Sequence, residues 1–337
     1  MHSKSRTTAL AQPLFRHAGR WLLATAVAVS AHATALADTF PDKPVRMVVP
    51  FSAGGTMDTF GRLVAGEMAK ALGTSVVIEN LTGAGGSIGS NNVARSAADG
   101  YSFCFCATGS TVILPLMDNK LPYKVPQDLL PVAHVLRIEQ TIVVNADKGA
   151  ASLAALVEQA RTKPTGLLYG TPGIGTSNHL AGELFKQASG TNIEPLHYKG
   201  EAPALVDLLS GQIDFMIASV SFAEPHVKAG KMRVLALTGP NRLPNYPAIA
   251  TIAESGFPGY EATTQVGLHV PKGTPRERID KLNAALNQAL QSKELRERMA
   301  ANGVTPVGGT PEAYAQFLTQ EYEKWGHVIK QAGIKLQ

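Results

Sequence analysis

The sequence predicts an α/β protein of two lobes, each with a mainly parallel β-sheet flanked by helices. Short apolar strands alternate with glycine-containing loops and amphipathic helices, an order typical of parallel sheets that are covered by helices. This order begins near Val45 and starts again after Asn145. Two long extended runs, near residues 137–144 and 262–270, are suited to cross from one lobe to the other.

The two crossings divide the chain. We expect residues 38–138 together with 263–337 to form lobe 1, and residues 139–262 to form lobe 2. In open α/β sheets, ligands bind beyond the carboxyl ends of the strands. The polar glycine loops follow predicted strands, so those of the two lobes are expected to face one another across a cleft. Hinged closure of two lobes is an established way of enclosing a ligand.

The stretch from Val45 to Gly73 is the clearest candidate for a binding site. An apolar strand, Val45–Val49, is followed by a turn of small residues, Ser52–Thr56, and then by apolar residues at helical spacing. Such a loop presents unpaired backbone N–H groups at the positive end of a helix, where a carboxylate can bind. No Gly-Lys-Ser/Thr follows, so the loop is not a P-loop. The alternative is a plain connection between strand and helix.

The N-terminus predicts export. Of the net charge of +5, residues 1–37 contribute four basic residues and no acid, so the rest of the chain carries about +1. A basic stretch ending at Arg20, an apolar core and the small-residue pattern Ala35-Leu36-Ala37 are typical of a signal peptide cleaved after Ala37. The alternative is an uncleaved anchor, but the apolar core is short for a bilayer span. No basic stripe indicates nucleic-acid binding.

Cys104 and Cys106 are the only cysteines, and their spacing places both on one face of a predicted strand. The favoured interpretation is two buried thiols that pack as small hydrophobic groups. A local disulfide in an oxidising compartment is the alternative, and the sequence does not fix the redox state. With no histidine nearby, the pair does not predict a metal site.

Motifs along the chain resemble one family. Residues 44–58 read Pro-Val-Arg-Met-Val-Val-Pro-Phe-Ser-Ala-Gly-Gly-Thr-Met-Asp, which is similar to the opening of the Bug (TctC-like) receptors. These are the extracytoplasmic solute-binding proteins of tripartite tricarboxylate transporters. Further matches follow in the same order over nearly the whole mature chain, including Gly83-Ala84-Gly85-Gly86, Gly175-Thr176-Ser177, Tyr198-Lys199-Gly200 and Gly308-Gly309-Thr310-Pro311.

The resemblance implies a periplasmic binding protein of the two-lobed, Venus flytrap type, with no enzyme activity and no cofactor or metal. It would capture a small organic carboxylate, such as a di- or tricarboxylate or an aromatic acid, and deliver it as a monomer to membrane permease subunits. Carried over by position, the ligand-binding residues are Phe51, Ser52, Ala53, Gly54, Gly55, Thr56, Asp58, Thr108, Ser110, Gly175, Thr176, Ser177, His179, Tyr198, Lys199, Gly200, Ser219 and Val220.

One departure from the family pattern bears on the ligand. After the strand at Ile213–Ile217, family members often carry Asp-Asn followed by Pro-Ser, whereas this chain reads Ala-Ser-Val-Ser-Phe at residues 218–222. Loss of that carboxylate removes a partner for a ligand ammonium group, so we predict an acid without an amino group. Phe51 and Phe222 would permit an aromatic ring in the cleft.

Other function classes fit the sequence less well. The same fold can pass its closed state to a signalling partner instead of a permease, and the sequence does not separate these roles. Gly85-Gly86-Ser87-Ile88-Gly89 matches the G-x-S-x-G pattern of hydrolases, but Ser87 does not directly follow a strand and is better explained as the start of a helix. His179 has no second histidine at metal-binding spacing.

Overall fold

Two β-sheets organise the chain between Pro41 and Gln337. The computed structural model describes residues 40–118, 120–198 and 200–334. The predicted signal peptide, residues 1–37, and the candidate site residue Lys199 therefore lie outside the described residues. None of the helices in the described ranges is both long enough and apolar enough to cross a membrane.

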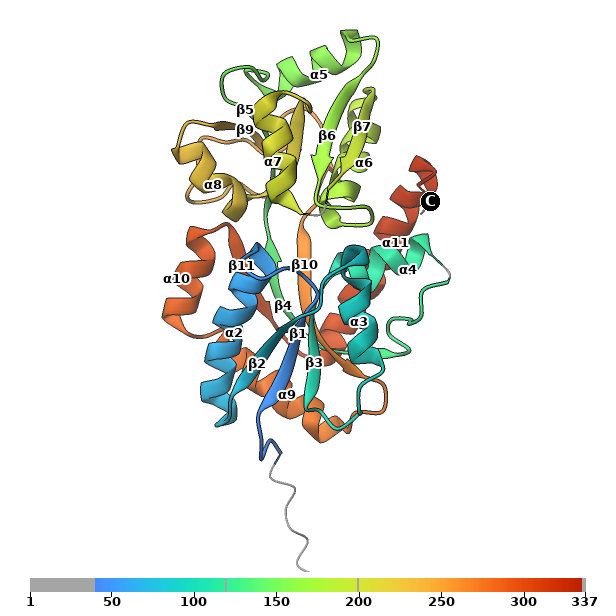
Figure 1. Ribbon diagram of the computed structural model, residues 1–337, viewed down its shortest axis with the longest axis vertical. Coiled ribbons are helices and arrows are strands. Elements are labelled where there is room, and N and C mark those ends of the chain that lie inside the picture. The colour runs from blue at the N-terminus through green and yellow to red at the C-terminus, as the bar shows by residue number, and fades with distance from the viewer. Residues whose placement is uncertain (1–39, 119, 199, 335–337) are drawn as a thin grey trace, which may run out of the picture. The chain divides into compact units, whose positions relative to one another are not determined.

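The first sheet has the strand order β11-β4-β10-β3-β1-β2 (Figure 1). Helices α2, α3, α9 and α11 pack against it. Its strands are β1 (Val45–Val49), β2 (Val76–Asn80), β3 (Ser102–Ala107), β4 (Leu129–Ile138), β10 (Thr264–Pro271) and β11 (Val304–Gly308). The helical segments of this part are α2 (Thr56–Leu72), η2 (Ala84–Gly86), α3 (Ser87–Ala94), η3 (Gly109–Ile113), α4 (Leu114–Met117), α9 (Arg276–Ala289), α10 (Lys293–Ala301) and α11 (Pro311–Ala332).

The second sheet has the strand order β7-β6-β8-β5-β9, and helices α6, α7 and α8 pack against its strands. Its strands are β5 (Gln140–Asn145), β6 (Leu167–Thr171), β7 (Ile193–His197), β8 (Phe215–Ser219) and β9 (Met232–Leu237). Its helices are α5 (Leu153–Thr162), α6 (Ser177–Ser189), α7 (Glu201–Ser210) and α8 (Val220–Lys228). The α/β class and the helix-flanked sheets agree with the sequence prediction.

The sheets are mixed rather than mainly parallel, which corrects the sequence prediction. In the first sheet, β1 pairs in parallel with β2 and β3, but β10 is antiparallel to both β3 and β4. In the second, β5 is antiparallel to β8 and β9. The antiparallel strands are the crossings and their neighbours, because a chain that leaves a sheet and returns must run back along it.

The crossing predicted near residues 137–144 is two strands in different sheets. Strand β4 ends at Ile138 and β5 begins at Gln140, so the break falls at Glu139 (Figure 1). The Glu139 amide donates to the Gly303 carbonyl of the first part, and the Glu139 carbonyl accepts from the Val220 amide of the second. The predicted lobe boundaries at residues 138 and 263 stay a prediction, although the sheets divide the chain at the same places.

Local signals account for most helix ends. Gly73 and Gly190 end α2 and α6 in left-handed conformation, with φ of 70° and 60°. Ser152 caps α5 by accepting from the Ala155 amide, as predicted. Strand β11 and the helical segment η3–α4 were not predicted, because neither stretch has a clear apolar period.

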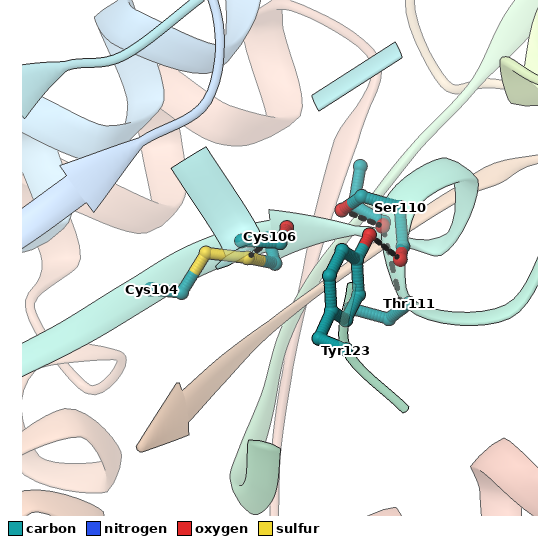
Figure 2. Close-up of a disulfide and its surroundings, with 7 residues drawn as sticks. Cys104, Cys106, Ser110, Thr111 and Tyr123 are labelled. Atoms are coloured by element: carbon teal, nitrogen blue, oxygen red, sulfur yellow. Dashed lines mark hydrogen bonds between the residues drawn. A yellow bond between two sulfur atoms is a disulfide. The ribbon is translucent and has the colours of Figure 1, made fainter. Parts of the chain in front are cut away.

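Cys104 and Cys106 form a disulfide in β3, so the favoured interpretation of two free thiols is wrong (Figure 2). Their Cα atoms are 5.3 Å apart, within the usual range for a disulfide, and both side chains are fully buried. The Cys106 sulfur lies 3.2 Å from the Ser90 hydroxyl. The alternative kept open from the sequence is therefore the one that the structure contains.

Two glycines inside helices give opposite predictions for substitution by alanine. A Cβ on Gly182 of α6 would lie 2.2 Å from the buried Tyr169 ring, whereas a Cβ on the exposed Gly66 of α2 would meet nothing within 4 Å. We expect Gly182→Ala to lower the free energy of unfolding by about 2 kcal/mol through overpacking. Gly66→Ala, the matched control, should raise it by up to about 1 kcal/mol. Urea unfolding of both variants checks this; equal effects would contradict the packing at Gly182.

Candidate ligand-binding site

The turn between β1 and α2 is an exposed arrangement of backbone donors. Residues 52–55 are exposed, and Gly55 is the N-cap of α2 with no side-chain cap. Within the described residues, neither the Thr56 nor the Met57 amide donates to a backbone or side-chain acceptor. Free N–H groups at the positive end of a 17-residue helix favour an anion.

The buried Asp58 side chain stabilises this turn through hydrogen bonds. Its carboxylate accepts from the Gly54 amide at 2.9 Å and from Asn80 Nδ2 at 3.0 Å, and it pairs with Arg62 at 2.9 Å. Burial opposes ionisation, but these hydrogen bonds keep the pKa of Asp58 below its usual value. Asn80 also donates to the Phe51 carbonyl at 2.9 Å. Both Asp58 oxygens therefore have partners within the chain, and Asp58 positions the loop.

A second helix N-terminus lies in the other part of the chain, at the loop between β6 and α6. Thr176 caps α6 by accepting from the His179 amide, while its hydroxyl donates to the Gly173 carbonyl at 2.7 Å. Gly173 and Gly175 have φ of 147° and 71°, values that favour glycine. The buried Ser177 hydroxyl has no hydrogen-bond partner among the described residues.

His179 holds this loop and shows no sign of acting as a base. Its Nδ1 accepts from the Gly175 amide at 3.2 Å, and its ring meets the His197 ring edge-on at 4.6 Å. Burial, with a smaller contribution from His197, lowers the pKa of His179 to about 3. The ring is therefore neutral at physiological pH. Among the described residues no cluster of His, Cys, Asp or Glu is suited to hold a metal ion.

The loops of the two parts contact one another. A Cβ on Gly85 would lie 3.3 Å from the Ile174 carbonyl oxygen, and a Cβ on Gly109 would lie 3.1 Å from that of Gly175. At a further contact, the Thr56 hydroxyl lies 3.2 Å from the hydroxyls of both Ser219 and Ser221. The structure thus brings the start of α2 directly against the end of β8.

Thr108 and Ser110, two predicted site residues, use their hydroxyls inside the chain. The Thr108 hydroxyl donates to the Gln265 carbonyl at 3.0 Å, and that of Ser110 to the Ala107 carbonyl at 3.2 Å. The Ser110 carbonyl in turn accepts from the buried Tyr123 hydroxyl at 2.6 Å (Figure 2). Both side chains are buried and support the backbone of this strand end.

The region from the end of β7 to the start of α7 includes Glu201, a residue that was not among the predicted site residues. Tyr198 donates its hydroxyl to Asp207 at 2.7 Å, and Gly200, the N-cap of α7, has a φ of 120°. Glu201, the first residue of α7, accepts from the Ser219 amide at 2.7 Å. Burial raises the pKa of Glu201 to about 7. An acidic residue at a helix start is a common dipole feature, so its type gave no signal of a site.

Val220 and Ser87 have structural roles. Val220 is buried at the start of α8, and its amide donates to the Glu139 carbonyl at the crossing. Ser87 begins α3, as predicted, and η2 lies between it and the end of β2 at Asn80. A nucleophile elbow requires a serine on a sharp turn directly after a strand, so the G-x-S-x-G match does not form one here.

Comparison with known proteins identifies the family. The model of the tripartite tricarboxylate transporter family receptor, TctC, matches residues 60–334. Protein BugT of Bordetella pertussis is 38% identical over 303 residues, which cover 89% of this chain and 93% of BugT. The structure of R. palustris Rpa4515 with adipate has a TM-score of 0.83 at 35% identity, covering 88% of this chain and 99% of that chain. Periplasmic binding protein BugD has a TM-score of 0.82 at 34% identity, covering 88% and 100%.

Two helix-flanked mixed sheets that bring glycine loops and helix N-termini together define a solute-binding protein of the periplasmic class. The chain belongs to the Bug, or TctC, family of receptors of tripartite tricarboxylate transporters. Members of this family are periplasmic receptors that bind a solute, rather than enzymes. The family resemblance predicted from the motifs is confirmed.

Proposed function

We propose that this chain captures a small organic carboxylate in the periplasm and delivers it to the membrane subunits of a tripartite transporter. The observation that carries the proposal is the exposed turn at the start of α2, where the Thr56 and Met57 amides have no acceptor among the described residues. Adipate, the ligand named for Rpa4515, supports a carboxylate as the ligand class.

The proposed mechanism is electrostatic and geometric, without covalent chemistry. Backbone N–H groups at the start of α2 bind the carboxylate, and closure of lobe 2 onto lobe 1 buries it. The lobes meet across Thr56, Ser219 and Ser221. We assign ligand contact to Phe51, Ser52, Ala53, Gly54, Gly55, Thr56, Gly175, Thr176, Ser177, Tyr198, Gly200 and Ser219. Asp58, Thr108, Ser110, His179 and Val220 would position these groups through the contacts described above.

The route to the periplasm is also part of the proposal. A signal peptide cleaved after Ala37 would release a mature, monomeric protein that docks on permease subunits. N-terminal sequencing of protein from the periplasmic fraction checks the cleavage site. Retention of the first 37 residues in that fraction would contradict it.

Thermal shift of the mature protein against mono-, di-, tri- and aromatic carboxylates, with uncharged amides of the same size as controls, tests the function. Binding to the native state raises the melting temperature by mass action. At a ligand concentration of a hundred times Kd, the free energy of unfolding increases by about 2.7 kcal/mol. We expect one narrow group of carboxylates to stabilise the protein. Native mass spectrometry of the same sample reveals any ligand that co-purifies. No response, in a sample shown to be free of ligand, would contradict carboxylate capture.

A further inference from the structure

Glu201 places a carboxylate group at the point where the two parts of the chain meet. Its Oε1 accepts from the Ser219 amide at 2.7 Å and lies 3.1 Å from the Ser219 hydroxyl, while its Oε2 lies 3.3 Å from the same hydroxyl. That hydroxyl lies 3.2 Å from the hydroxyl of Thr56, the first residue of α2. Glu201 is therefore two hydrogen bonds from the proposed anion site.

The hydroxyl protons of this cluster do not saturate the Glu201 carboxylate. Ser219 has a single hydroxyl proton, for which Oε1, Oε2 and the Thr56 hydroxyl all lie within reach, while the Ser221 hydroxyl donates to Ser219 Oγ. Oε1 is held by the Ser219 amide, but Oε2 has only a share of that one proton. A carboxylate oxygen accepts more than one hydrogen bond, so Oε2 retains acceptor capacity for a donor group of a ligand.

The charge of Glu201 has no counter-ion among the residues that the structure describes. Within the described residues, which omit Lys199, Glu201 forms no ion pair, and the groups that contact its carboxylate are those of Ser219. An ionised carboxylate placed beside it would meet like-charge repulsion. A hydroxyl, amide or ammonium group placed there would instead donate a hydrogen bond to Oε2.

We propose that Glu201 is a specificity-determining residue of the ligand site, and that the ligand presents a hydrogen-bond donor to it beside the carboxylate that is anchored at the start of α2. The inference rests on the proposed function and narrows its ligand class. Dicarboxylates that would place a second ionised carboxylate against Glu201 are disfavoured, and acids with a hydroxyl, amide or ammonium group at that position are favoured.

This changes the basis of one sequence prediction. An acid without an amino group was predicted because no carboxylate follows β8 at residues 218–222. Glu201 supplies a carboxylate to the same strand end from the start of α7. Because Glu201 lies 18 residues before Ser219, the sequence pattern around β8 did not indicate this contact. An ammonium group therefore has a partner in this chain after all.

The test compares matched ligands on the full mature protein and on Glu201→Gln. The probes are succinate, 4-hydroxybutyrate and 4-aminobutyrate, together with the six-carbon series adipate, 6-hydroxyhexanoate and 6-aminohexanoate. Calorimetric titration at about pH 8 keeps Glu201 ionised, because burial raises its pKa to about 7. Glu194→Gln removes a carboxylate from β7 that pairs with Lys186, away from Ser219, and is the matched control.

In the wild type we expect the hydroxy or amino acid to bind at least about tenfold more tightly than the dicarboxylate of the same length. Glu201→Gln should reduce this ratio about tenfold, because glutamine keeps an acceptor for the Ser219 amide but removes the charge. Glu194→Gln should leave the ratio unchanged. Glu201→Ser, which also removes the charge, serves as a second variant if the glutamine protein does not fold.

The outcomes separate the two proposals. If wild type binds carboxylates but the ratio is the same in Glu201→Gln, the role of Glu201 is overturned while carboxylate capture stands. If the wild type prefers the dicarboxylates, the role of Glu201 is likewise overturned. If ligand-free wild type binds none of the probes and none of the wider carboxylate panel, the proposed function fails, and the selectivity assigned to Glu201 fails with it.

Discussion

Gly55→Asp is expected to abolish carboxylate binding, with at least a hundredfold rise in Kd, while the protein stays folded. Gly55 is the N-cap of α2, with φ of −80° and ψ of 172°, a conformation that any residue adopts. A Cβ there meets only the Ser52 carbonyl oxygen, at 3.4 Å. An aspartate at an N-cap accepts from the amides two and three residues on, here Met57 and Asp58. The new carboxylate would thus occupy the Met57 amide, one of the two donors proposed for the ligand, and add its charge beside the other, the Thr56 amide.

Two further substitutions at residue 55 separate charge from shape. Gly55→Asn takes the same amide donors without a charge and should weaken binding less than Gly55→Asp. Gly55→Ala adds only a methyl group and should retain most of the affinity. The free energy of unfolding should change by less than about 1 kcal/mol in the aspartate variant. Calorimetric titration measures the affinity, and urea unfolding measures the free energy of unfolding. If Gly55→Asp bound the carboxylate with wild-type affinity, the start of α2 would not be the anion site.

The sequence predicted the parts of the fold that depend on local chemistry. The apolar run before Pro50 became β1, and the helical spacing that ends at Gly73 became α2 with Gly73 as its cap. Strand β11 was missed because Val304–Gly308 is short and half exposed, and it exists only through its pairing with β4. Strand direction was also mistaken, because antiparallel pairing of β10 with β4 joins residues more than a hundred positions apart.

In the candidate site, too, local features could be predicted from the sequence but contacts between distant residues could not. A glycine turn at a helix start is visible in the sequence, and the structure places its free amides there. The contacts that hold this turn could be predicted only in part. Asp58 and Arg62 have the i, i+4 spacing of a helical ion pair, but Asn80, which also donates to Asp58, lies at the end of β2. Glu201 and Ser219 are 18 residues apart and meet through the packing of α7 on β8, which no local pattern encodes.

The second large expected effect is a loss of folding stability at acidic pH, caused by buried histidines. His269 lies in β10 with no exposed surface, and neither ring nitrogen has a hydrogen-bond partner among the described residues. Burial, together with the neighbouring His134, lowers the pKa of His269 to about 4, and the Gly267 backbone opposes this. In the unfolded chain an ordinary histidine has a pKa of about 6.5. Between about pH 6.5 and about pH 4, the His269 ring is therefore protonated in the unfolded state but neutral in the folded state.

His269→Leu is expected to make the protein less sensitive to acid. Above about pH 6.5 the ring is neutral in both states, so its contribution does not vary with pH. Between about pH 6.5 and 4 the wild type loses up to about 1.4 kcal/mol of stability per pH unit through this group, and below about pH 4 the loss stops. The stability of the variant relative to wild type should thus rise by about 2 kcal/mol from pH 6 to pH 4.5. Urea unfolding at the two pH values measures the difference.

The comparison of variant with wild type is needed because other groups titrate in the same range. Burial also lowers the pKa of His134 and His179, whereas it raises that of Glu201, which opposes them as the pH falls. The contributions of His179 and Glu201 are common to both proteins and cancel in the difference, whereas that of His134, which interacts with His269, cancels only in part. Val270→Ala, in the same strand, is the control and should lower stability equally at both pH values. An equal shift for His269→Leu at both pH values would mean that the buried ring binds a proton as readily in the native state as in the unfolded chain, and thus has a partner that the structure does not show.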